Sequence, residues 1–178
     1  MIRTERLVLR PPEDRDSPAL VAMLSDREVM ERLVRDPSVE SAERSLVRHR
    51  GYRQQHGLGF WAVEFEDKVV GLCGLKPGAE NTPIAGELEI GWLFSKPVWG
   101  KGVAREAAEA SLNWAWENHP AMRVVAITGA DHIASQKLMG KLGMSRLADG
   151  DFLHPLYEAD DPMARSVTFA IARPKPAG

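Results

Sequence analysis

The sequence predicts one α/β domain built on a mixed sheet, and its central stretch carries most of that prediction. Residues 86–105 start with a strand-like alternation, pass through a glycine-rich turn and enter an alanine-rich helix that runs to about Asn118. Val124 to Thr128 follows as a short β-branched strand. Strand–helix–strand units cross over right-handedly, so strands 87–94 and 124–128 should run parallel, side by side or nearly so. A chain of 178 residues is long enough for one domain with its own core.

A second pattern in the sequence predicts a pair of antiparallel strands. Phe60 to Phe65 and Val69 to Leu75 are apolar strands separated by Glu66-Asp67-Lys68, which is a hairpin pattern. The remaining expected elements are an opening strand at 4–10, helices at 14–24 and 41–55, a possible helical continuation at 27–35, a helix at 133–141 closed by Gly143, and strand regions at 144–147, 150–157 and 166–172. We expect one domain over residues 1–173 and a disordered tail at 174–178.

Composition narrows the class of protein. The net charge of −2 gives no basic field that would favour nucleic acid, and we expect no such partner. Cys73 is the single cysteine, so no internal disulfide can form, which fits the reducing cytoplasm. It lies in an apolar run and reads as a buried residue rather than a nucleophile. The sequence has neither an apolar run of membrane-spanning length nor the pattern of a signal peptide, so no membrane association is expected.

The turn at residues 99–105 predicts a site for an anion. Gly100 and Gly102 let the backbone come close to a ligand, and the following helix directs its free N–H groups and positive dipole end to the same place. It is not a Walker A loop, because Lys101 is followed by glycine, and Arg105 stands where a dinucleotide fingerprint needs its third glycine. Taken alone, the turn also fits a plain tight connection.

The segment Trp99-Gly-Lys-Gly-Val-Ala104 resembles the acyl-CoA pyrophosphate loop of the GNAT acetyltransferase superfamily, Gln/Arg-x-x-Gly-x-Gly/Ala. Trp99 replaces the usual Gln or Arg. The chain is similar in particular to the ribosomal-protein N-terminal (alanine/serine) acetyltransferase branch, over about residues 3 to 172. The segments that carry this likeness are Thr4 to Pro11, Glu89 to Trp92, Trp99 to Gly102, Ala104 to Ala107 and Ser135 to Met144.

The resemblance implies a GNAT-like fold with a central twisted, mostly antiparallel sheet, flanking helices, and strands 87–94 and 124–128 splayed apart. Acetyl-CoA would enter that cleft and meet an amine acceptor, either a protein or peptide N-terminus or a small amine. A homodimer is also implied as possible. The cofactor-binding residues would be Leu93, Phe94, Trp99, Gly100, Lys101, Gly102, Val103, Ala104, Arg105, His132 and Ser135.

Two glutamates are candidates for the base that deprotonates the amine. We expect Glu89 to take this role, with burial and the neighbouring Glu87 raising its pKa, although either residue could instead pair with an arginine or face solvent. The acid that protonates the leaving thiolate is less defined. His132 and Met139 stand where relatives carry Asn and Tyr, which leaves Ser135, Tyr157 or water. These departures keep a non-catalytic acyl-CoA-binding regulatory module open as an alternative, and the anion turn keeps a nucleotide-binding protein open.

Charged side chains bear on the acceptor. The helix at 41–55 carries Arg44, Arg48, His49, Arg50 and Arg53. These residues form a solvated face, a wall of the acceptor site or a docking surface for something acidic. If the acidic residues at 151, 158, 160 and 161 lay near the site, they would favour a cationic acceptor. The histidines show no metal-ligand spacing, and no metal is expected.

Overall fold

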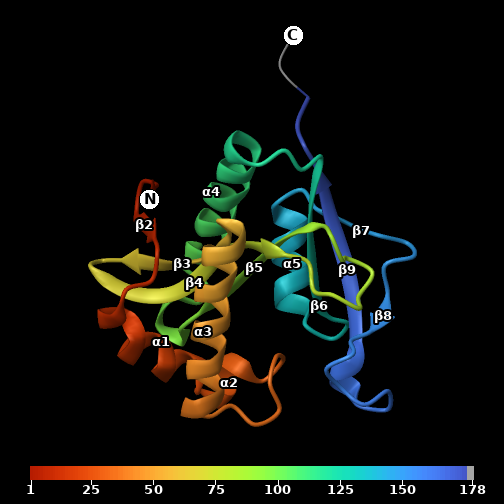
Figure 1. Cartoon of the computed structure of the whole chain (residues 1–178), viewed down its shortest axis with the longest axis horizontal. Helices are drawn as coiled ribbons and strands as arrows, with labels where there is room; N and C mark the ends of the chain where they lie inside the picture. Colours follow the sequence, from red (N-terminus) through yellow and green to blue (C-terminus); the bar gives the residue numbers. More distant parts are fainter. Residues whose placement is uncertain (176–178) are drawn as a thin grey trace.

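The computed structural model describes residues 1–175, in which nine strands form one twisted sheet (Figure 1). The strand order is β1-β2-β3-β4-β5-β6-β9-β7, with β8 also paired to β9. The strands are β1 (Ile2–Arg3), β2 (Leu7–Arg10), β3 (Gly59–Phe65), β4 (Lys68–Pro77), β5 (Leu88–Phe94), β6 (Arg123–Gly129), β7 (Ser145–Arg146), β8 (Phe152–Leu153) and β9 (Arg165–Ala172). The helices are α1 (Ser17–Leu24), α2 (Arg27–Met30), α3 (Val39–His56), α4 (Val103–Asn118) and α5 (Ile133–Lys141), with 3₁₀ turns at η1 (Asp14–Asp16), η2 (Lys96–Val98) and η3 (Pro162–Ala164). The expected tail at 174–178 lies outside the described residues from position 176 on.

The predicted fold class is confirmed, because all strand pairs are antiparallel except the pair β5 and β6. The hairpin between β3 and β4 turns at Glu66 and Asp67, whose φ angles of 51° and 58° match the tight two-residue turns that suit twisted strands. Helix α3 begins after Ser38, whose side chain accepts the N–H of Ser41 at 3.1 Å, and ends at Gly57 with a left-handed φ of 66°.

The parallel strands β5 and β6 separate soon after they meet. Their register contains only the pairs Leu88 with Val124 and Glu89 with Val125. Beyond this point β5 stays paired with β4 as far as Phe94, and β6 stays paired with β9 as far as Gly129. Each strand follows its own antiparallel partner, and the expected splay is present.

Helices cover both faces of the sheet. Helix α4 packs on β2, β4 and β5, whereas α1 and α3 pack on the opposite side (Figure 1). Ala110 and Trp114 of α4 are half-buried. The buried stripe consists of Val103, Ala107, Ala108, Ser111, Leu112 and Ala115. These small residues allow close helix–sheet packing.

Two expected elements are shorter than the sequence pattern suggested. Helix α2 ends at Met30 instead of continuing to residue 35, and residues 32–34 line a cavity described below. The strand expected at 144–147 is the two-residue strand β7, while β8 is the part of 150–157 that forms a strand. Both are held by β9, and the chain between them is irregular.

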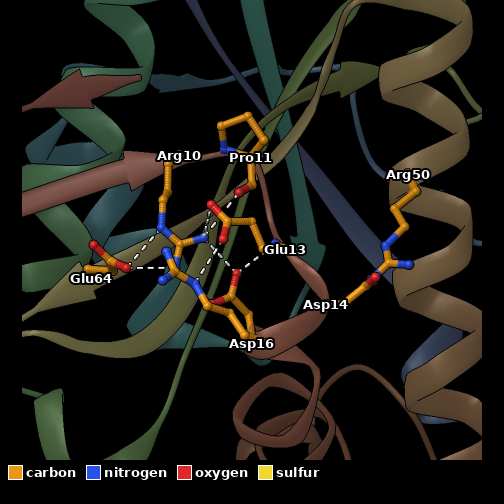
Figure 2. A network of polar contacts seen from close by, with 8 residues as sticks. Arg10, Pro11, Glu13, Asp14, Asp16, Arg50 and Glu64 are labelled. Carbon is orange, nitrogen blue, oxygen red and sulfur yellow. Dashed lines mark hydrogen bonds and ion pairs between the residues drawn. The ribbon is translucent and has the colours of Figure 1, made fainter.

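A buried arginine fixes the start of the chain (Figure 2). Arg10 on β2 donates to both carboxylate oxygens of Asp16, at 2.7 and 2.8 Å, and to Glu64 of β3 at 2.6 Å. Asp16 also accepts the N–H of Glu13 at 2.7 Å. The network joins β2, β3 and η1, and so sets where α1 begins.

Among the helices of residues 1–175, none combines the length and the apolar character that crossing a membrane would require.

Candidate active site

A cavity of about 780 Å³ lies where β5 and β6 separate. Its walls come from β5 (residues 89–93), the end of β6, one face of α3, the first turns of α5, residues 32–34 and residues 154–157. Of the residues proposed from the sequence, Glu89, Leu93, His132 and Ser135 line this cavity. The segment 99–105 lies outside it and forms a separate, mostly exposed loop.

Glu89 is a buried carboxylate with only 6% of its surface exposed. It stands opposite Lys76 in the β4–β5 ladder, and the Lys76 ammonium forms an ion pair with it. Burial raises the pKa of Glu89, while Lys76 and the backbone of Ala79 act in the opposite direction. The sequence predicted the burial of Glu89 but missed Lys76.

Glu87 has a different environment. Arg123 donates to it through Nε at 3.1 Å, and this pairing lowers the pKa of Glu87. Glu87 does not line the cavity. Of the two expected causes of a raised pKa at Glu89, burial is therefore the one that operates. Glu87 itself forms the arginine pair that the sequence left as an alternative.

The edge of β5 that faces β6 carries free backbone groups. Ser95 N–H donates to Val70 O at 2.9 Å, and antiparallel pairing alternates, so Leu93 and Gly91 also point their N–H groups toward β4. The N–H groups of Trp92 and Phe94 consequently point into the gap. Leu93 contributes its side chain to the cavity wall.

The loop after β5 has the backbone shape that an anion requires. Gly100 and Gly102 have left-handed φ angles of 74° and 79°, and Gly102 is the N-cap of the 16-residue helix α4, where no side chain caps the helix. The first N–H groups of α4 are therefore free for a ligand, and a Cβ at Gly100 would meet nothing within 4 Å. This geometry fits the pyrophosphate of CoA.

Trp99 has a structural role at the loop entrance. Its indole Nε1 donates to the carbonyl of Phe94 at 2.7 Å, and the side chain is 47% exposed. The bond ties the start of the loop to the end of β5. Trp99 therefore occupies the position of the usual Gln or Arg as a brace with an exposed ring face.

Basic side chains surround the loop. Arg105 pairs with Glu109 one turn along α4, at 2.8 Å, and so lies along the helix. Arg6 was not singled out from the sequence, yet its guanidinium donates to the Lys101 carbonyl at 3.1 Å and pairs with Glu106 at 2.6 Å. These contacts hold the segment between β1 and β2 against the glycine loop.

The start of α5 forms the opposite side of the cavity. His132 is the N-cap residue of α5 and bonds through Nδ1 to Thr128 Oγ1 at 3.2 Å, and burial lowers its pKa. Ser135 follows in the first turn, buried with 8% exposure. Asp131 pairs with Arg32 instead of capping the helix. Met139 is fully buried in the core at the position where relatives carry Tyr.

Tyr157 is already engaged. Its hydroxyl donates to the Leu33 carbonyl at 2.7 Å, and burial raises its pKa. The bond joins residues 154–157 to the segment after α2 across the cavity. Tyr157 thus holds the wall together, which favours Ser135 or water as the proton source.

The basic helix divides its charges between two sides. Arg44, Arg48 and His49 line the cavity. Arg50 pairs with Asp14 at 2.9 Å, and Arg53 donates to the Gly59 carbonyl at 3.2 Å. One side of this helix therefore lines the cavity, and the other side contacts the rest of the protein.

The acidic residues after β7 lie elsewhere. Asp151 pairs with Arg146 at 2.6 Å, and Asp161 pairs with Arg35 and caps η3. None of the four residues at 151, 158, 160 and 161 lines the cavity. The argument for a cationic acceptor loses its basis.

Cys73 is fully buried, and burial raises the pKa of its thiol to about 12. It is a core residue, as expected. Among residues 1–175, no three His, Cys, Asp or Glu side chains come together in a way that would hold a metal ion.

Comparisons with known proteins agree with this geometry. The family described as the acetyltransferase (GNAT) domain matches residues 6–145. The uncharacterized N-acetyltransferase YnaD of Bacillus subtilis is 30% identical over 147 residues, which cover 82% of each chain. A GNAT acetyltransferase from Bacillus anthracis has the same fold, with a TM-score of 0.77, 24% identity and coverage of 97% and 98%. RimL, described as a ribosomal L7/L12 alpha-N-protein acetyltransferase in complex with coenzyme A, has a TM-score of 0.74, 17% identity and 95% coverage of both chains. The match to the family over most of the chain establishes that this protein belongs to the GNAT acetyltransferases.

Proposed function

We propose that the protein is an acetyl-CoA-dependent N-acetyltransferase that acetylates a primary amine by direct attack in a ternary complex, with Glu89 as the base. The observation that carries the proposal is a buried carboxylate facing a cavity of about 780 Å³ at the point where β5 leaves β6. The family supports acetyl transfer, and the CoA-bound RimL structure supports the choice of donor.

Glu89 is suited to the proton transfer. A primary amine with a pKa near that of lysine, about 10.4, is protonated at neutral pH and must lose a proton before it attacks. Burial raises the pKa of Glu89, which makes the carboxylate a stronger base. The Lys76 ammonium keeps the carboxylate charged in its buried position.

The donor side uses backbone groups and a helix end. Residues 100–105 bind the pyrophosphate through free N–H groups, Trp99 braces the loop, and the N–H groups of Trp92 and Phe94 receive the pantetheine arm as an added strand would. His132, the N-cap residue of α5, forms part of the cavity wall on that side. Acetyl-CoA supplies an activated thioester, and Ser135 or water protonates the released thiolate. A thiol with a pKa near 8.5 leaves readily as the thiolate, so a dedicated acid is not required.

The acceptor is a protein or peptide N-terminus or a small amine. The setting is the cytoplasm, which agrees with a single buried free cysteine.

The test compares Glu89→Gln with Glu87→Gln. The assay measures thiol release from acetyl-CoA with a panel of peptides and small amines. We expect Glu89→Gln to lower kcat about 100-fold, as loss of a general base does, while CoA affinity by calorimetry stays unchanged. Wild-type kcat/KM should fall as the pH drops through the raised pKa of Glu89, and the variant should lose this dependence. Glu87→Gln is the control, because Glu87 lies two residues before Glu89 but pairs with Arg123. Its activity should stay within about threefold of the wild type, since the change removes only an exposed ion pair.

A second candidate has its own observation. Met139 and His132 stand where an acid and a cofactor contact are expected, which favours an acyl-CoA-binding module without turnover. Tight CoA binding by the wild type with no acetylation of any amine would support that candidate. Full activity in Glu89→Gln would remove Glu89 as the base.

A further inference from the structure

The inference rests on the proposed function and concerns the acceptor. We propose that the acceptor is a primary amine that also carries a carboxylate or phosphate group, and that Arg48 and Arg44 of α3 bind this anionic group.

The first support is the composition of the helix face. The residues of α3 that line the cavity recur every three or four positions and so share one face: Ser41, Ala42, Arg44, Ser45, Arg48, His49 and Tyr52. Arg44 and Arg48 are exposed to solvent where they line the cavity, beside the hydroxyl groups of Ser41 and Ser45. Guanidinium and hydroxyl groups are hydrogen-bond donors suited to carboxylate and phosphate.

The second support is the pairing of charges on the cavity wall. Three of the four cations have a carboxylate partner: Arg32 pairs with Asp131, Lys76 with Glu89 and Arg44 with Glu40. Arg44 has only an exposed contact to Glu40 at 2.8 Å, one turn away on its own helix. Arg48 contacts the Ser45 hydroxyl at 3.3 Å, and within residues 1–175 no carboxylate pairs with it. Arg48 is therefore available to an anionic ligand.

Two acids line the cavity from elements other than α3. Glu80 and Glu89 come from the loop after β4 and from β5. Glu80 follows Ala79, whose backbone contacts Glu89. These carboxylates suit the amine of the acceptor, whereas the arginines of α3 suit an anionic group on the same molecule.

The third support is the effect of these cations on histidines in two walls. His49 stacks on Phe60 with ring centroids 4.3 Å apart, and its pKa is lowered to about 3 by burial and then by Arg48 and Lys76. On the opposite wall, burial and Lys76 lower the pKa of His154. Burial is the first cause of both shifts, and at His49 the Arg48 guanidinium adds to it. A guanidinium without a carboxylate partner disfavours a second cation beside it and attracts an anion.

The volume limits the distance between the two groups. About 780 Å³ is the size of a small-molecule site, so the anionic group must be close to the amine. Two sources share this chemistry: a small amine that carries a carboxylate or phosphate, and the first residues of an acidic peptide N-terminus.

The experiment measures kcat/KM for matched acceptors. One arm uses peptides that begin Ser-Asp-Glu or Ser-Lys-Arg, and the other uses aspartate and phosphoethanolamine beside putrescine. We expect the anionic acceptor of at least one arm to exceed its cationic counterpart about tenfold, with a preference that shrinks as salt rises. The arm with the larger kcat/KM identifies the source.

Variants locate the effect. Arg48→Gln should raise KM for the preferred anionic acceptor about tenfold, as loss of a charge-assisted contact does, and leave KM for acetyl-CoA unchanged. Arg44→Gln should act in the same direction more weakly, and Arg48→Glu should reverse the charge preference. Arg50→Gln is the matched control, since Arg50 is on the same helix but pairs with Asp14 away from this cavity.

The outcomes separate the two proposals. If no amine in either arm is acetylated, the proposed function fails. If amines are acetylated but cationic ones are preferred, or if Arg48→Gln equals Arg50→Gln, the function stands and this inference is overturned. A raised KM for acetyl-CoA in Arg48→Gln would assign Arg48 to the cofactor and would also overturn it.

Discussion

His49 combines a structural cost with a place on the acceptor wall. Among residues 1–175, its Nδ1 is the buried side-chain nitrogen or oxygen that lacks a hydrogen-bond partner. The ring lies between Tyr52 and Phe60, at centroid distances of 5.9 and 4.3 Å. The aromatic contacts stabilise the ring, while the unpaired nitrogen costs free energy of burial.

His49→Phe should therefore increase the free energy of unfolding by about 1 kcal/mol at pH 7.5. The pKa of His49 falls from its ordinary 6.5 to about 3, so between these values only the unfolded chain takes up the proton. The wild type should lose stability relative to the variant as the pH falls through this window. Urea unfolding at pH 7.5 and pH 5 measures both effects, with exposed His56→Phe on α3 as the control. Parallel pH curves for wild type and His49→Phe would contradict the prediction.

Glu87 and Glu89 show how much of a residue's role can be predicted from the sequence before the fold is known. Strand alternation placed Glu87 and Glu89 on one face and could not separate their roles, whereas β5 begins only at Leu88, after Glu87. The difference arises from partners distant in the chain, since Arg123 is 36 residues from Glu87 and Lys76 is 13 residues from Glu89. Cross-strand register decides such pairs, and no local pattern contains it.

At the scale of elements, local signals were the reliable ones. The helix expected at 41–55 is present as α3, two residues longer at its start, and α5 ends before Gly143 as expected, because glycine stops act through their nearest neighbours. The end of α2 was not predictable, because Leu33 and Val34 extend the helical apolar pattern but line the cavity instead.

The junction of the glycine loop and α4 gives a test at this scale. Gly102→Ala forces a side chain into a left-handed conformation, which costs about 1–2 kcal/mol. The new Cβ would also lie 3.4 Å from the Arg6 guanidinium. We expect lower thermal stability and weaker CoA binding by calorimetry, because the loop must change shape.

Gly140→Ala is the control for this change. Gly140 lies in α5 with open space around it, so alanine there should stabilise the helix by about 0.5–1 kcal/mol and leave CoA affinity unchanged. Equal CoA affinity in Gly102→Ala and the wild type would argue against the loop as the phosphate site.

At the scale of the whole molecule, the order of strands and helices along the chain was what predicted the fold. The strand–helix–strand unit and the likeness over residues 3 to 172 predicted the mixed sheet and its splayed centre. The shape of the cavity could not be predicted from the sequence, because its walls at α3, 32–34 and 154–157 meet through contacts such as the bond from Tyr157 to Leu33. Such contacts join residues 124 positions apart.

The buried Arg10 network is the long-range contact to perturb. Asp16→Ala removes both bonds from Asp16 to Arg10 and leaves a buried guanidinium with Glu64 as its main partner (Figure 2). Breaking a buried pair costs about 3–5 kcal/mol, so the urea midpoint should fall strongly. Asp151→Ala breaks the exposed pair with Arg146 and should cost less than about 1 kcal/mol. Similar losses in both variants would mean that Arg10 does not hold the N-terminal strand in place.

The brief meeting of β5 and β6 has a consequence for the lifetime of the protein. Two register pairs join the half of the sheet that contains β1–β5 to the half that contains β6–β9. A ligand that contacts both halves would be released when either half opens. It would therefore increase the free energy of unfolding by mass action, by about 2.7 kcal/mol at a ligand concentration 100 times its Kd. Under the proposed function, that ligand is a CoA thioester. Protease resistance and turnover of the chain would then follow the size of the CoA pool, and starvation for acyl donor would shorten the life of the enzyme that consumes it.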